Sequence, residues 1–128
     1  MTPLRDGELA GLALLSLLLL GGCRHDSSDR RWQVAGGDPD RGSVAIERYG
    51  CGSCHLVPGL NLPGGAVGPP LAGFGRRTYV AGRLPNVPDS LVQWLMDPQR
   101  FEPGRAMPNL GVTEKDARDM AAYLYTLQ

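Results

Sequence analysis

Lysine is almost absent from this 128-residue sequence, in which Lys115 is the single lysine among thirteen basic residues. Thirteen acidic residues balance the basic ones, so the formal net charge is zero. A domain that binds nucleic acid usually carries excess positive charge gathered on one face. The charge balance therefore gives no support to that function, and we expect no nucleic-acid partner.

Convincing alternation of apolar and polar residues, the pattern of a half-buried β-strand, is also missing. Helical signals appear instead in three segments, near residues 38–50, 89–96 and 113–127. Glycine and proline dominate residues 56–88. An irregular stretch of this length is reasonable inside a small domain if it wraps a large rigid ligand. We therefore predict an all-α domain in which three main helices and irregular loops surround a bound group.

The first predicted helix has signals at both of its ends. Asp38 can cap its N-terminus, Pro39 suits the first helical position, and Gly50 can end it. Gly42 lies inside this helix, where glycine is unfavourable compared with alanine. Either the position simply tolerates glycine, or another helix approaches the chain closely there.

The other two predicted helices have similar signals at their ends. Asp89 or Ser90 is expected to cap the second helix, and Asp97, which precedes a proline, is expected to end it. Thr113 is expected to cap the third helix, with Asp116 three residues later in an aspartate version of the capping box. Both helices have an apolar face and are therefore predicted to pack against a core.

The N-terminal part of the chain contains an apolar run of 14 residues at 9–22. This run is too short to span a membrane comfortably and fits the apolar region of a signal peptide. The sequence LGGC at 20–23 resembles the lipobox of bacterial lipoproteins. We therefore predict a signal peptide at 1–22 that is removed before Cys23, whose thiol would carry the lipid.

Two alternatives remain for this segment: an uncleaved signal anchor, or plain secretion with Cys23 unmodified. Each of them places the rest of the chain outside the cytoplasmic membrane, on its periplasmic side. Residues 23–37 are charged and end in glycine, which predicts a flexible tether. The folded domain is then expected to occupy residues 38–128.

Cysteine and histidine are scarce beyond the signal peptide. Apart from Cys23, the sequence has Cys51, Cys54 and His55 in the motif CGSCH, and His25 in the predicted tether. Zinc would need two further ligands, and no second CxxC motif supplies them. A redox dithiol of the thioredoxin type would need a βαβ context that is absent. CxxCH is instead the attachment signature of c-type haem, so we predict haem c bound covalently through Cys51 and Cys54.

Four blocks of the sequence, in order, resemble the class I cytochromes c, a family of small single-haem electron carriers. The blocks are the helix and haem motif at 38–55, GPPLAGFGRR at 68–77, DSLVQWLMDPQRFEPGRAMPNLG at 89–111, and the C-terminal helix ending in AAYLYTL. The resemblance covers about residues 38–127. It implies the family's all-α fold, with three main helices and loops wrapped around haem.

The resemblance also implies roles for single residues. His55 and Met107 would be the axial ligands of the haem iron, although core packing is the alternative for a methionine. The Pro69 carbonyl would accept a hydrogen bond from His55 Nδ1, unless this proline only forms a turn. Arg76 would lie near a haem propionate, or else on the solvated surface.

By the same resemblance, a set of apolar side chains is expected to line the haem. Trp94 is also expected to contact the haem, and it stands where many mitochondrial relatives have a tyrosine near the methionine sulfur. Tyr79 and Asn86 are candidates for propionate contacts, in a loop that is shorter than in those relatives. Gly42 and Tyr123 fall where the terminal helices cross in this family, which favours close packing at Gly42. The apolar residues expected to line the haem are Leu71, Leu91, Leu95 and Phe101.

The implied function is the transfer of single electrons by a membrane-tethered periplasmic cytochrome c. A terminal oxidase, a quinol-oxidising complex or a dehydrogenase is the expected partner by family analogy. We expect a carrier rather than an enzyme, because both axial positions of the iron would be filled. Two rivals stay open: a haem enzyme or gas sensor with an open sixth coordination site, and a permanent haem subunit of an oxidase or dehydrogenase complex.

Overall fold

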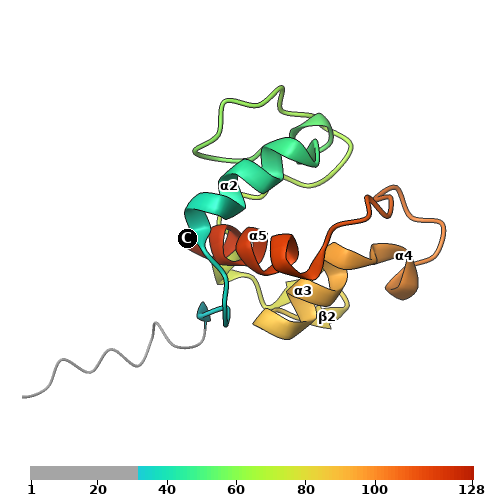
Figure 1. Ribbon diagram of the computed structural model, residues 1–128. Helices are drawn as coiled ribbons and strands as arrows, with labels where there is room; N and C mark the ends of the chain where they lie inside the picture. Colours follow the sequence, from blue (N-terminus) through green and yellow to red (C-terminus); the bar gives the residue numbers. More distant parts are fainter. Residues whose placement is uncertain (1–31) are drawn as a thin grey trace, which may run out of the picture.

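The structure is a computed structural model that describes residues 32–128 (Figure 1). The predicted signal peptide at 1–22, the predicted lipidation site Cys23, and His25 lie outside the described residues. Within residues 32–128, no helix combines the length and the apolar character that crossing a membrane requires.

Helices make up nearly all of the regular structure, as predicted. The three predicted helices are present as α2 (Pro39–Arg48), α3 (Pro88–Met96) and α5 (Glu114–Thr126). The all-α prediction is therefore confirmed, with one small hairpin added. The shorter elements between the three helices are the 3-10 helices η2 (Cys51–Ser53) and η3 (Phe74–Arg76), the strands β1 (Tyr79–Val80) and β2 (Leu84–Pro85), and the helix α4 (Pro98–Phe101).

Helix α2 begins and ends where its sequence signals predicted. The Asp38 carboxylate accepts a hydrogen bond from the Arg41 backbone N–H at 2.9 Å, and Pro39 is the first helical residue. Gly50 follows the helix with a φ of 71°, a backbone conformation that glycine adopts without steric cost. This turn directs the chain from α2 into the CxxCH motif.

The predicted cap of α3 is wrong. Helix α3 begins at Pro88, its N-cap residue is Val87, and this residue makes no side-chain cap. Proline suits the first helical position because its fixed φ matches the helix and its missing N–H would lack a helical partner. Asp89 and Ser90 therefore lie inside the first turn. The predicted cap of α5 is confirmed, because Thr113 Oγ1 accepts a hydrogen bond from the backbone N–H three residues later at 3.2 Å.

The two strands form an antiparallel hairpin that the sequence analysis missed. Tyr79 pairs with Pro85 and Val80 pairs with Leu84. Three residues, 81–83, connect the strands, with Ala81 at a φ of 52°, Gly82 at 73°, and the Arg83 N–H donating to the Val80 carbonyl at 3.0 Å. Positive φ at both positions is typical of a tight hairpin turn, but asparagine or aspartate is far more usual than alanine at the first of them. The short strands and the alanine together explain why no hairpin signal was visible.

Helices α2 and α5 cross at close range, and Gly42 is the reason that they can. A Cβ atom at Gly42 would lie 2.0 Å from the backbone oxygen of Asp119 and 3.0 Å from Cβ of Tyr123. Figure 1 shows the first turn of α2 next to α5, with the rest of α2 rising away from it. Of the two interpretations left open for Gly42, close approach of another helix is therefore correct.

A buried carboxylate reinforces this crossing. The side chain of Asp119 is 1 % exposed and accepts hydrogen bonds from Arg41 Nε at 2.9 Å and from Arg41 Nη2 at 2.8 Å. Lys115 Nζ and the backbone N–H of Asp38 donate to the same carboxylate, each at 2.9 Å. The hydrogen bonds from Arg41, aided by the other donors, hold the pKa of Asp119 well below its usual range. The carboxylate thus stays charged and ties the start of α2 to α5.

The last part of the predicted tether packs against the domain. The Trp32 ring lies 5.0 Å from the Tyr125 ring between centroids, and Val34 is only 8 % exposed. Arg118 Nη1 donates a hydrogen bond to the Ala35 carbonyl at 3.2 Å. Ordered contacts therefore begin at least six residues before the predicted boundary at Asp38. A tryptophan and a valine in this polar segment were the signals for it.

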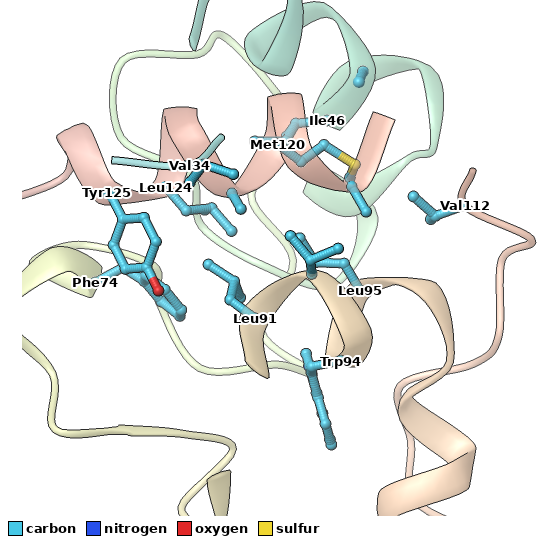
Figure 2. Packing of buried hydrophobic residues seen from close by; sticks show 14 of the residues in the cluster. Val34, Ile46, Phe74, Leu91, Trp94, Leu95, Val112, Met120, Leu124 and Tyr125 are labelled. Carbon is cyan, nitrogen blue, oxygen red and sulfur yellow. The ribbon is translucent and has the colours of Figure 1, made fainter. Parts of the chain in front are cut away.

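Helix α3 closes the core on the side opposite to α2. Figure 2 shows Leu91 and Leu95 pointing from α3 toward α5, whereas Trp94 points away from α5. Leu91 is 1 % exposed and Trp94 is 7 % exposed, so both sides of the helix are covered. Burial of these side chains supplies most of the driving force for holding α3 in place.

The close crossing leads to a first prediction. Gly42→Ala should lower the free energy of unfolding by about 3 kcal/mol, the upper end of the usual range for an overpacked core. The added methyl group would meet a backbone oxygen of α5, which cannot move aside as a side chain can. Chemical denaturation would measure the change. Val44→Ala is the control, because Val44 is 60 % exposed on the same helix and should change stability by less than about 0.5 kcal/mol. Equal stability of Gly42→Ala and the wild type would contradict the argument.

Candidate haem site

A cavity of about 640 Å³ lies between the helices and the loops. This volume is in the range typical of sites for small molecules and cofactors. Walls come from η2, the loop at 67–71, the hairpin, helix α3 and the segment at 102–110. Nearly all of the predicted site residues within 32–128 line this one cavity. They are Cys51, Cys54, His55, Pro69, Leu71, Leu91, Trp94, Leu95 and Met107.

The CGSCH motif forms a tight turn that presents its side chains to the cavity. The backbone N–H groups of Cys54 and His55 both donate to the Cys51 carbonyl, at 3.2 and 3.0 Å. Gly52 is buried under Leu62, and a Cβ atom there would lie 2.5 Å from Cβ of that leucine. Cys51 and Cys54 form no disulfide with each other, and burial raises the pKa of the Cys51 thiol.

The imidazole of His55 is held in one orientation. Its Nδ1 lies 2.7 Å from the Pro69 carbonyl oxygen. Because a carbonyl can only accept, Nδ1 must carry the proton and donate, which leaves the lone pair on Nε2. The partner loop is itself fixed, since the Gly68 N–H donates to the Cys54 carbonyl and the Leu71 N–H donates to the Leu56 carbonyl, each at 2.8 Å. The neutral imidazole is thus oriented so that its Nε2 can bind a metal ion.

Gly68 is the residue that makes room for this ring. A Cβ atom at Gly68 would lie 2.3 Å from Cε1 of His55 and 2.6 Å from its Nδ1. These distances are far below van der Waals contact, so only glycine fits beside the imidazole in this position. The need for glycine at the start of GPPL therefore has a direct steric cause.

Met107 reaches the cavity from the irregular segment between α4 and α5. Its side chain is half-buried and lines the cavity. Met120 of α5 is 1 % exposed, belongs to the core and forms part of the cavity wall. Met96 packs against the core from α3 and does not line the cavity. Among these three methionines, Met107 is the one on a loop.

Two predicted lining residues lie elsewhere. Arg76 is exposed and does not line the cavity, whereas the neighbouring Arg77 does. Arg77 Nη2 donates to the carbonyls of Pro70 and Ala72, and its guanidinium stacks on the Phe74 ring. The two adjacent arginines could not be told apart from the sequence, because the 3-10 turn of η3 decides which of them faces inward.

The other misplaced residue is Phe101, which packs beside Trp94 with the ring centroids 6.3 Å apart and does not line the cavity. Of the two candidates for propionate contacts, Tyr79 lines the cavity and Asn86 does not. Asn86 is buried instead, where it donates to the Phe74 and Arg77 carbonyls and accepts from the Tyr125 hydroxyl. It thus connects the hairpin to η3 and α5.

Sequence reasoning missed an acidic residue in the cavity wall. Glu102 is 7 % exposed and forms ion pairs with Arg105 at 3.3 Å and Arg83 at 3.6 Å. Glu102 and Arg105 both line the cavity. No pattern in the sequence signals a buried glutamate in this segment, which is rich in charge, proline and glycine.

Comparison with known proteins agrees with this geometry. A family model described as cytochrome c matches residues 39–128. The chain belongs to the cytochrome c family. Membership in this family implies a bound haem and electron transfer by means of it. The cavity suits such a group, because two thiols, an oriented imidazole and a thioether line a mostly apolar space.

Three relatives, each named cytochrome c oxidase subunit 2, are similar to part of this chain. The one from Alkalihalophilus pseudofirmus is 36 % identical over 90 residues, which are 70 % of this chain and 25 % of the relative. Those from Bacillus sp. strain PS3 and Bacillus subtilis are 33 % identical over 88 residues and 32 % identical over 87. Each alignment covers 66 % of this chain, and 25 % and 24 % of the respective relatives. The chain thus spans about a quarter of the length of these relatives.

The contact between Gly68 and His55 gives a second prediction. Gly68→Ala should push the imidazole out of its position, break the hydrogen bond to Pro69 and destabilise the fold by about 1–3 kcal/mol, as overpacking usually does. NMR would detect the change in the His55 ring resonances, and denaturation would measure the stability. Ala66→Ser, at a nearby exposed residue that does not line the cavity, is the control and should leave both unchanged. An unmoved His55 ring in Gly68→Ala would refute the steric argument.

Proposed function

We propose that the chain is a cytochrome c that transfers single electrons between partners of a respiratory chain. Haem c occupies the cavity, attached through Cys51 and Cys54, with His55 and Met107 as axial ligands. The proposal rests on one observation above all: these four residues line the same cavity. When bound, haem supplies an iron that takes up and releases one electron at a time.

His55 contributes an imidazole whose donor strength and direction are set by Pro69. The hydrogen bond from Nδ1 to the Pro69 carbonyl fixes the tautomer and increases the electron density on Nε2. Met107 contributes a thioether, a soft and weak ligand that favours ferrous iron and raises the reduction potential. With both axial positions filled, the protein has no place for a substrate on the iron, so we infer a carrier rather than an enzyme.

The apolar side chains that α3 contributes to the cavity wall also suit the proposed electron transfer. Leu91, Trp94 and Leu95 are each at most 7 % exposed and present an apolar surface to the cavity. These side chains exclude water and are held by the core, so they need not rearrange when the charge in the cavity changes. A rigid, dry environment of this kind suits fast electron transfer.

The proposal extends to the place where the protein works. The lipobox-like LGGC supports a lipid on Cys23 after removal of residues 1–22, which would hold the domain on the periplasmic side of a bacterial membrane. A tethered carrier stays close to membrane complexes, and a terminal oxidase, a quinol-oxidising complex or a dehydrogenase would exchange electrons with it.

A second candidate function is that of a permanent haem subunit of a terminal oxidase. The similarity to three proteins named cytochrome c oxidase subunit 2 favours it. In this alternative the site and its ligands are the same, but the chain does not leave its complex.

Purification from native membranes in mild detergent tests these proposals together. We expect a red protein with the mass of one covalent haem added, and a ferric spectrum that is low-spin with the weak long-wavelength band of sulfur bound to iron. Separation from other subunits supports a carrier, and comigration with an oxidase supports the permanent subunit. A colourless protein at its unmodified peptide mass would refute haem attachment. A high-spin protein that binds cyanide rapidly would indicate an open sixth coordination site.

Replacing the proposed thioether ligand tests the axial assignment. Met107→Ala should remove the long-wavelength band and lower the reduction potential by on the order of 0.1 V or more, within the ~0.8 V range that axial ligands span. Met96→Ala makes the same chemical change at a methionine outside the cavity, and it should keep both the band and the potential. If Met107→Ala keeps them too, another group binds the iron.

A further inference from the structure

The side chain of Gln99, in helix α4, spans the loop that carries Met107. Its Oε1 accepts a hydrogen bond from the Gly104 backbone N–H at 2.9 Å. Its Nε2 donates to the Arg105 carbonyl at 3.0 Å and to the Met107 carbonyl at 2.7 Å. An N–H can only donate and a carbonyl can only accept, so the orientation of the amide is unambiguous. One side chain thus binds three backbone groups of this loop.

The loop has little else to hold it in this region. Pro103, Gly104, Arg105 and Ala106 are all exposed, and no regular element includes them. Glu102 forms ion pairs nearby, but its partners Arg83 and Arg105 have side chains that are 64 % and 70 % exposed. Ion pairs with such exposed partners contribute little. The backbone just before Met107 also has a hydrogen bond of its own, from the Arg105 N–H to the Glu102 carbonyl at 3.3 Å, which is longer than any of the three bonds from Gln99.

Helix α4, which carries Gln99, is itself held in place by several contacts. Pro98 is buried, and Asp97 Oδ1 accepts from the Arg100 backbone N–H at 3.3 Å, which caps the short helix. Phe101 packs beside the buried Trp94 of α3. The same Asp97 oxygen accepts from Asn109 Nδ2 at 3.2 Å, so a weaker contact holds the loop after Met107. The loop is thus held on both sides of the methionine, with Gln99 as its principal contact.

We propose that Gln99 is a positioning residue that holds the Met107 backbone so that the thioether stays at the cavity. It thereby sets how often the sixth coordination site opens to another ligand. This inference rests on the proposed role of Met107 as an iron ligand. The long side chain of Gln99 can hold this exposed loop, and with it the weakly binding thioether of Met107, without burial of more of the loop.

Ligand exchange in the ferric protein tests the proposal. With imidazole or cyanide as the probe, Gln99→Ala should bind the added ligand roughly ten times faster or more, since each lost hydrogen bond shifts an opening equilibrium about fivefold. The long-wavelength sulfur band should weaken in parallel. Amide hydrogen exchange at Gly104, which needs no iron chemistry, should also become about five times faster or more.

A second variant separates hydrogen bonding from side-chain size. Gln99→Glu keeps the shape but loses both donated bonds, and at neutral pH it places a carboxylate against two carbonyl oxygens. It should bind imidazole at least as fast as Gln99→Ala. Binding at the wild-type rate in Gln99→Glu would overturn the proposal, and it would do so even if the alanine variant failed to fold.

The control is Gln93→Ala, which removes the same amide from an exposed position on α3 and should match the wild type in band, ligand binding and haem content. A wild-type protein without the sulfur band would contradict Met107 as a ligand, and hence the proposed function. A wild-type protein with the band, together with unchanged ligand binding in Gln99→Ala, would refute the role of Gln99 alone.

Discussion

The contact of Gly42 with the backbone of α5 is the constraint on which the rest of this molecule depends. It allows α2 and α5 to cross at a distance that no residue with a side chain would permit. The crossing brings Ile46 of α2 and Met120 and Leu124 of α5 to the same cavity wall. It also fixes the point at which the chain leaves α2 and turns into the CxxCH motif. The cysteines and the histidine therefore owe their position to a packing contact made earlier in the chain, within α2.

Around this crossing, the segments that carry His55, Pro69 and Met107 have little regular structure. Single hydrogen bonds between loops replace the ladders of a sheet or helix, as between Gly68 and Cys54 or between His55 and Pro69. Glycines permit these approaches at Gly52 and Gly68, where any side chain would collide with a neighbour. Loops of this kind gain much of their stability from what they enclose, which agrees with a bound haem at the centre of a small domain.

The sequence predicted the helices and singled out residues that line one cavity, because the helix ends and the CxxCH motif depend on local signals. Asp38 and Thr113 cap their helices through contacts within three residues, and CxxCH is a short motif. The hairpin was missed because its strands have two residues each. Whether Arg76 or Arg77 faces the cavity depends on one turn of backbone, which residue type alone does not encode. The contacts of Gln99 were likewise invisible, since they join a side chain to backbone groups of a loop with no periodic pattern.

The packing of residues 32–37 has a practical meaning for anyone who shortens the protein. Trp32 covers the ring of Tyr125, and Val34 belongs to the buried cluster next to α5. A soluble version that starts at Asp38 would uncover an aromatic ring and an apolar patch on the C-terminal helix, and so invite self-association. One that starts a little before Trp32 keeps this cover and leaves out Cys23, the proposed lipidation site.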